Sequence, residues 1–299
     1  MPIADSHSDR LERAHVSLAG LSVGDAFGER LFANQEAIDH RRLPPPRWAT
    51  TDDTEMAIAV VDVLRRHECI KEDRLALAFA RRFVRDPYRG YGPNVQFVLN
   101  DIHGGRPWRE VAQEAFGGTG SMGNGSAMRV APLGAYFADD GKRLVSEASR
   151  SAVVTHAHPD GQAGAVAVAA AAGWAARGGG EASSLFDVVL LATPSGPTRD
   201  GIERAAGLPL DADPLAVSLE VGAGREVVCS DTVPFCLWAF ARHLGDYVET
   251  LWTTVSVPGD RDTNCAIVGG LAGALVGHEG IPEEWLAARE PLRHDLDLT

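Results

Sequence analysis

Two short runs of acidic and hydroxyl residues each precede an apolar segment with helical spacing. They are Thr51-Asp52-Asp53-Thr54 and Gly259-Asp260-Arg261-Asp262-Thr263-Asn264. A single acid at a helix start needs no explanation beyond capping and the helix dipole. Two neighbouring carboxylates exceed that need, and they repel each other unless a cation lies between them. Both runs offer only oxygen donors, which favour Mg²⁺, Mn²⁺ or Ca²⁺ over zinc.

If both helix starts face one cleft, their four carboxylates and two threonine hydroxyls can hold two divalent cations. A pair of ions held in this way orients substrate oxygens and stabilises charge during hydrolysis. The sequence therefore indicates a binuclear site built from segments that are far apart in the chain.

A glycine-rich loop runs from Gly117 to Gly125. It lacks the GK[ST] ending of a nucleotide P-loop, and it does not follow a predicted strand. Its backbone amides can still cradle phosphate oxygens, because glycine permits a close approach. Taken alone, a flexible turn is the simpler interpretation of this loop.

Two smaller motifs also contain chemically useful side chains. Gly24-Asp25, followed by Gly28, is typical of a helix terminus with a capping acid, and Glu29 adds a further carboxylate. The Thr155-His156-Ala157-His158 run contains two histidines, but no third nitrogen or sulfur ligand is close in sequence. A hydrogen-bonding histidine at a cleft rim is therefore favoured over a zinc site.

The elements that position these motifs are expected to be helices. Apolar residues recur at steps of three and four from Leu11 to Leu21 and from Met56 to Val63. Strand signals are few, and a helix over 183–192 suits its sequence as well as a strand over 188–191. We predict an all-α chain with further helices over 72–85, 91–103, 107–115, 140–154, 160–177, 229–244, 246–256 and 263–277.

The chain of 299 residues is expected to form one compact domain over residues 11–290, with a flexible N-terminus (1–10) and a C-terminal tail (291–299). The segment 193–214 contains four prolines and is interpreted as a surface loop, because the acidic runs fall on both sides of it.

The overall charge narrows the function. With 28 basic and 41 acidic side chains, the formal net charge is −13. This balance argues against sequence-independent nucleic-acid binding and against docking on an anionic membrane. The four cysteines fit neither a zinc motif nor a disulfide framework, and the first ten residues are polar, without the apolar segment typical of a signal peptide. We expect a cytoplasmic monomer.

In this order, the motifs resemble the ADP-ribosylglycohydrolase family. The family's GxxxGDAxG segment is matched from Gly20 to Gly28, and its TDDT run from Thr51 to Thr54. The remaining matches are GTGSMGNGSAMRVAPLG from Gly118, the Thr155-His156 pair, and GDRDTNCAIVGGLAGALVG from Gly259. The resemblance spans most of the chain.

The resemblance implies an all-α fold with two Mg²⁺ (or Mn²⁺) ions in one cleft, and hydrolysis of the bond between C1″ of ADP-ribose and an acceptor on a protein or nucleobase. By resemblance, the metal ligands map to Thr51, Asp52, Asp53, Asp260, Asp262 and Thr263. The substrate-binding residues map to Gly120, Ser121, Met122, Gly123, Asn124, Gly125 and His156, with the loop at the diphosphate and His156 beside the ribose or phosphate. The candidates for the carboxylate that orients or deprotonates water are Asp53, Asp262 and Glu29.

One departure from the family pattern concerns the acceptor side of the cleft. Many members of the family have a glutamate near the positions held here by Leu31 or Phe32, whereas this chain has Glu29 directly after Gly28. Either the substrate-side carboxylate has moved to Glu29 or it is missing. The alternative function is therefore that of a non-catalytic ADP-ribose-binding member of the family.

Overall fold

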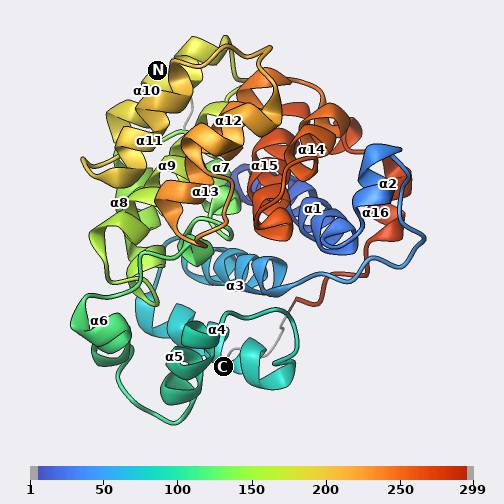
Figure 1. Cartoon of the computed structure of the whole chain (residues 1–299). Coiled ribbons are helices and arrows are strands. Elements are labelled where there is room, and N and C mark those ends of the chain that lie inside the picture. Colours follow the sequence, from blue (N-terminus) through green and yellow to red (C-terminus); the bar gives the residue numbers. More distant parts are fainter. Residues whose placement is uncertain (1–5, 295–299) are drawn as a thin grey trace.

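The first long helix and the last long helix pack against each other along the centre of the molecule (Figure 1). These are α1 (His7–Leu31) and α15 (Arg261–Val276) in the computed structural model, which describes residues 6–294. Small residues allow the close approach: a Cβ placed on Gly24 would lie 2.0 Å from the carbonyl oxygen of Cys265. One placed on Gly28 would lie 2.7 Å from Cα of Asp262.

Helices surround this pair, and the described residues form no β-strand, which confirms the predicted all-α, single-domain fold. The helices between α1 and α15 are α2 (Gln35–Asp39), α3 (Asp52–His67), α4 (Glu72–Arg85), α5 (Pro93–His103), α6 (Trp108–Gly118), α7 (Ala131–Tyr136), α8 (Gly141–Val153), α9 (Pro159–Ala176), α10 (Ala182–Ala192), α11 (Pro197–Ala206), α12 (Pro214–Val221), α13 (Cys229–Arg242) and α14 (Tyr247–Val255). A last helix, α16 (Glu283–Ala288), and two 3₁₀ turns (Asn124–Ser126 and His278–Gly280) complete the fold.

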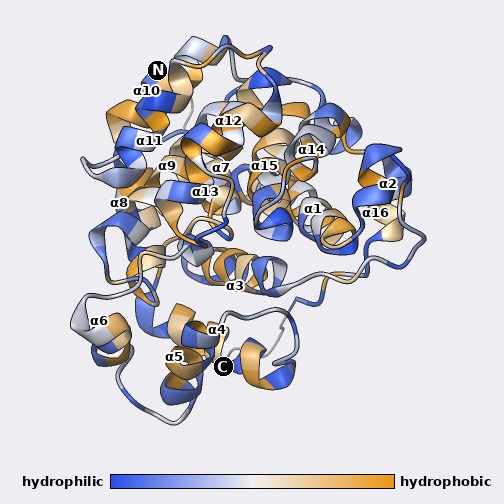
Figure 2. Cartoon of the chain, in the orientation of Figure 1, coloured by the Kyte–Doolittle hydropathy of each residue, from blue (hydrophilic) through white to orange (hydrophobic). Residues whose placement is uncertain are grey.

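Outer helices such as α4 and α8 contain both hydrophobic and hydrophilic residues (Figure 2), and their buried positions recur at helical spacing, as is typical of helices with one face toward the core. The centre also contains α9, in which nearly every residue from Gly161 to Ala175 is buried. Its alanines and glycines let neighbouring helices come close; a Cβ on Gly134 of α7 would lie 2.2 Å from the carbonyl oxygen of Ala169. None of the helices in the described range is long and apolar enough to span a bilayer.

Three sequence predictions about elements need correction. The segment 193–214 is not a loop throughout, because two of its prolines, Pro197 and Pro214, begin helices α11 and α12. Proline suits the first helical turn, where its missing N–H has no partner to lose. Residues 6–10, expected to be flexible, instead start α1, since Ser6 and Asp9 form a capping box. The remaining part of that prediction, residues 1–5, lies outside the described residues.

The third correction concerns Gly24-Asp25, which is not a helix terminus. The helix α1 continues through Gly28 to Leu31. The glycines serve helix packing here, and Asp25 lies in the middle of a buried helical surface.

Candidate functional site

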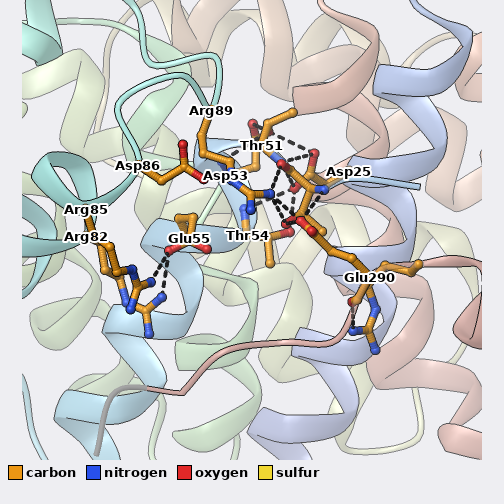
Figure 3. A network of polar contacts seen from close by, with 12 residues as sticks. Asp25, Thr51, Asp53, Thr54, Glu55, Arg82, Arg85, Asp86, Arg89 and Glu290 are labelled. Atoms are coloured by element: carbon orange, nitrogen blue, oxygen red, sulfur yellow. Dashed lines mark hydrogen bonds and ion pairs between the residues drawn. The ribbon is translucent and has the colours of Figure 1, made fainter. Parts of the chain in front are cut away.

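Asp25 on α1 binds the first turn of α3. Its buried carboxylate accepts hydrogen bonds from the backbone N–H of Thr51 (2.9 Å) and of Thr54 (3.2 Å), and from both threonine hydroxyls (Figure 3). Burial raises the pKa of Asp25 to about 6, although these hydrogen bonds oppose the increase. Asp25 thus accepts hydrogen bonds from backbone groups at the start of α3, the turn that contains Asp52 and Asp53.

The first turn of α15 is held by a different set of partners. Asp260 donates its backbone N–H to the carbonyl oxygen of Ala223 (3.1 Å), and its Oδ2 accepts from Nδ2 of Asn124 (2.7 Å). The same amide group of Asn124 is 3.1 Å from Oγ1 of Thr232, a buried residue of α13. The glycine-rich loop is therefore tied directly to one of the acidic runs.

Both acidic runs open onto one cavity of about 440 Å³. The described residues that line it are Asp52, Asp53, Met56, Gly90, Gly92, Pro93, Asn94, Val95, Phe116, Gly120, Ser121, Met122, Gly123, Asn124, Gly125, Met128, Arg129, Thr155, His156, Glu226, Val227, Val228, Asp260, Asp262 and Thr263. The fold therefore brings together the four carboxylates of the two acidic runs, the loop from Gly120 to Gly125, and His156, with Glu226 as a fifth acidic side chain.

These carboxylates disfavour one another's charge. Burial is the main cause that raises the pKa of Asp52 to about 8, and the Asp25 carboxylate adds to the increase. The pKa values of Asp53 and Asp262 are also raised well above the usual range, first by burial and then by neighbouring aspartates. Without a cation, the cluster cannot carry its full negative charge at neutral pH.

Two carboxylate oxygens show how a cation would fit. Oδ1 of Asp53 and Oδ1 of Asp262 are buried and have no hydrogen-bond partner within residues 6–294. Buried carboxylate oxygens are costly to leave unpaired, and hard divalent cations prefer such ligands. Within the same range, no three acidic, histidine or cysteine side chains are already arranged as a closed metal site. The donor set nevertheless fits divalent cations, because its two orphaned oxygens belong to residues that line the cavity.

The loop from Gly120 to Gly125 also lines the cavity. A Cβ on Gly120 would lie 2.5 Å from the backbone nitrogen of His158, so only glycine fits there. The backbone N–H groups of Ser121 and Met122 donate no hydrogen bond to other described residues. Backbone donors of this kind can bind an anionic oxygen.

Two predicted site residues do not line the cavity. Thr51 caps α3, and its hydroxyl lies 2.8 Å from oxygens of both Asp25 and Asp53. Glu29 is exposed on the surface of α1. At the positions of the family's glutamate, Leu31 is buried and Phe32 is exposed, with its carbonyl oxygen bound by Arg261 (2.8 Å).

Sequence reasoning missed several residues of the site. Asp25 was interpreted as a cap, although an acid flanked by small residues inside an apolar helix is a signal of a buried carboxylate. Arg129 was quoted only as part of a motif, yet it is fully buried and lines the cavity. Phe116, at the break in α6, and the apolar Pro93 and Val95 also line the cavity, and no spacing rule would have found them.

An all-α fold with two acidic helix starts and a glycine-rich loop around one cavity is the arrangement that the family resemblance implies. The sequence profile described as ADP-ribosylglycohydrolase matches residues 6–298, so the chain belongs to this family. It is accordingly an ADP-ribosyl glycohydrolase by class.

Individual relatives agree with this assignment. ADP-ribosylhydrolase ARH3 of Mus musculus is 32% identical, over 92% of this chain and 86% of its own length. ADP-ribosylarginine hydrolase Tri1 of Serratia proteamaculans is 23% identical, over 95% of this chain and 77% of its own. A solved structure titled ADP-ribosylglycohydrolase-related protein complex has a TM-score of 0.67 and 27% identity, covering 95% of this chain and 94% of that one.

Proposed function

We propose that this enzyme is a metal-dependent hydrolase that cleaves the C1″ glycosidic bond between ADP-ribose and an acceptor and so reverses ADP-ribosylation. The observation that carries the proposal is the pair of orphaned buried oxygens of Asp53 and Asp262. They belong to the same cavity as a glycine-rich loop with unpaired backbone donors. A ligand with both hydroxyls and a diphosphate matches this combination.

In this proposal, two Mg²⁺ or Mn²⁺ ions are held by oxygen atoms of Asp52, Asp53, Asp260, Asp262 and Thr263. Thr51 belongs to the same set by resemblance, and it holds Asp53 in place through the contact between its hydroxyl and Oδ2. When bound, the ions supply positive charge that orients ribose hydroxyls and offsets the developing charge of the reaction.

In the same proposal, the polarity of each remaining part of the cavity indicates which group of ADP-ribose it binds. The loop amides of Ser121 and Met122 suit the diphosphate, and His156 suits an oxygen of the ribose or phosphate. The apolar lining residues Phe116 and Val95 suit the adenine base, since a flat heterocycle buries well against aromatic and aliphatic surface. We propose that Asp53 or Asp262 orients the attacking water, because both residues line the cavity and glycoside cleavage requires water beside the anomeric carbon.

The acceptor is the part of the substrate beyond C1″. The Serratia relative is named for arginine, whereas the mouse relative's name states no acceptor. This chain also lacks the glutamate that many family members have near Leu31 and Phe32. We therefore propose a protein side chain or a nucleobase as the acceptor class, and the assay below covers both.

We further propose that the enzyme acts as a cytoplasmic monomer. Its four cysteines are all free thiols, and three of them are buried. Free thiols of this kind persist where glutathione and thioredoxin keep the environment reducing.

The decisive experiment measures release of free ADP-ribose from ADP-ribosylated arginine, serine and nucleobase substrates. We expect release from at least one of them with Mg²⁺ or Mn²⁺, and none after treatment with EDTA. Calorimetry with ADP-ribose provides the second measurement. Binding of ADP-ribose without turnover of any substrate would favour the non-catalytic alternative, and release that EDTA does not reduce would contradict the metal sites.

A further inference from the structure

A chain of hydrogen bonds connects the buried Arg129 to His156 through one hydroxyl group. Nη2 of Arg129 lies 2.9 Å from Oγ1 of Thr155, and this oxygen lies 2.7 Å from Nδ1 of His156. All three side chains are buried and all three line the cavity. The order of donors and acceptors along these hydrogen bonds decides whether Nε2 of His156 offers a ligand a hydrogen-bond donor or an acceptor.

Arginine can only donate, so Thr155 must accept the bond from Arg129. The single hydroxyl hydrogen of Thr155 then needs an acceptor, and within the described part of the chain Nδ1 of His156 is the acceptor in reach. Nδ1 is therefore unprotonated. A neutral imidazole has one N–H group, which must then be on Nε2.

Two further contacts hold the side chain of Arg129 in place beside Thr155. Its guanidinium also donates to the carbonyl oxygen of Ser151 (3.0 Å), and it lies over the ring of Phe79 at 4.3 Å. Burial lowers the pKa of Arg129 to about 9, so it remains charged at neutral pH. Burial and this positive charge together lower the pKa of His156 to about 3, which keeps the imidazole neutral.

Nε2 of His156 points toward the glycine-rich loop. A Cβ on Gly123 or on Gly125 would lie 3.3 Å from this nitrogen. Nε2 makes no hydrogen bond to any residue in the range 6–294, although His156 lines the cavity. The nearby titratable residues, His158 and Asp160, bind elsewhere: Nδ1 of His158 accepts from the Asp160 N–H, and Oδ1 of Asp160 accepts from the Thr198 N–H.

We propose that Arg129 and Thr155 are positioning residues that fix His156 as a neutral Nε2–H donor directed at an acceptor oxygen of the ligand. The proposal deepens the function proposed above, since the oxygen would be a phosphate or ribose oxygen of ADP-ribose. A fixed donor contributes at any pH at which the enzyme works, because it has no proton to gain or lose there.

The first test needs no ligand. Two-bond ¹H–¹⁵N correlation spectra of the full chain labelled with ¹⁵N-histidine report which ring nitrogen carries the proton, and a His156→Gln variant assigns the signal. We expect the Nε2–H tautomer, unchanged between about pH 5 and pH 8. An Nδ1–H tautomer, or a His156 signal that titrates in this range, would overturn the proposal.

The second test compares Thr155→Val, which removes the hydroxyl at nearly constant shape, with Thr155→Ser, which keeps it. For Thr155→Val we expect mixed tautomers and about tenfold weaker ADP-ribose binding by calorimetry with Mg²⁺ present, as for a lost hydrogen bond. The Thr155→Ser enzyme should have the wild-type tautomer and the wild-type affinity for ADP-ribose. A single Nε2–H tautomer in folded Thr155→Val, checked by circular dichroism, would refute the relay.

The two tests separate the two proposals. If the wild-type enzyme fails to bind ADP-ribose, the proposed function is wrong, and the tautomer spectra of the wild type and of Thr155→Val still decide the inference about His156.

Discussion

At the scale of the residue, the site is a set of carboxylates whose neighbours oppose their ionisation. Asp53 and Asp262 each have a buried oxygen without a partner, and both have strongly raised pKa values. Such groups reduce the stability of a metal-free protein at neutral pH. Their arrangement fits the cations that we propose they hold, and burial in the fold alone does not explain it.

Replacing Asp262 tests this explanation. Asp262→Asn removes one negative charge and one proposed ligand at nearly constant volume. We expect metal-dependent ADP-ribose release to fall by at least about 100-fold. The free energy of unfolding in EDTA at pH 8 should rise by about 1 kcal/mol, because repulsion within the cluster is relieved. Activity is read from released ADP-ribose, and stability from denaturant unfolding.

Two matched variants complete the comparison. Asp211→Asn changes an exposed aspartate and should alter neither activity nor stability. Glu29→Gln should keep activity within about twofold if the water-orienting carboxylate lies in the cavity. Loss of activity in Glu29→Gln alone would place that carboxylate on the surface of α1, and a less stable Asp262→Asn protein would show that the charge supports the fold.

At the scale of the element, the contact between α1 and α15 determines where the carboxylates meet. Gly20, Gly24 and Gly28 are spaced one helical turn apart and lie against the backbone of α15. Because α15 begins at Arg261, this contact sets Asp25 on α1 beside the start of the second acidic run.

The glycine face of α1 can be tested at Gly24. In Gly24→Ala the new Cβ would meet the carbonyl oxygen of Cys265 at 2.0 Å, which the backbone can relieve only by moving the helices apart. We expect a loss of about 2–4 kcal/mol in the free energy of unfolding, despite the higher helix propensity of alanine.

The control is Gly141→Ala in the first turn of α8, where a Cβ would meet no heavy atom within 4 Å. This variant should be as stable as the wild type or more stable. An equally stable Gly24→Ala protein would show that α1 and α15 are not in close contact in solution.

At the scale of the whole molecule, the carboxylate cluster determines how stability depends on pH. The folded-state pKa values of Asp25 and Asp52, about 6 and about 8, exceed the ordinary value of 3.8. The folded protein therefore binds more protons than the unfolded chain. The protonated cluster contributes to the free energy of unfolding at low pH, and this contribution is lost as pH rises through these pKa values.

Metal-free protein should accordingly lose about 1–3 kcal/mol of stability between about pH 6.5 and pH 8. Desolvation lowers the pKa values of His15 and of the buried His156, and these histidines act in the opposite direction, but mainly below pH 6.5. Glu72 and Glu290 have lowered pKa values and stay ionised throughout this window.

The measurement is denaturant unfolding across this pH range, with EDTA and with Mg²⁺ or Mn²⁺. The cations should restore the lost stability at pH 8, because they bind the deprotonated cluster. A metal-free protein that becomes more stable from pH 6.5 to pH 8 would contradict the raised pKa values.

The local sequence pattern predicted the helices well, but it did not predict which side chains the tertiary structure would bury. The helix predicted over 72–85 is observed with the same limits, because its apolar periodicity belongs to one segment. The segment 193–214 was misjudged since proline starts a helix as readily as it interrupts one. Asp25 was misjudged because the glycines on either side of it were interpreted as a helix end, whereas they allow α1 to pack closely against α15.

The sequence by itself determined the all-α class, most helix limits, and the residue types of two acidic runs and a glycine-rich loop. Only the tertiary structure decided that these segments share one cavity, that Glu29 and Thr51 do not line it, and that Arg129 reaches His156 through Thr155. The physical reason is the range of each effect. Helix periodicity acts between residues a few positions apart, whereas burial, the repulsion between carboxylates and hydrogen-bond direction depend on distances through space.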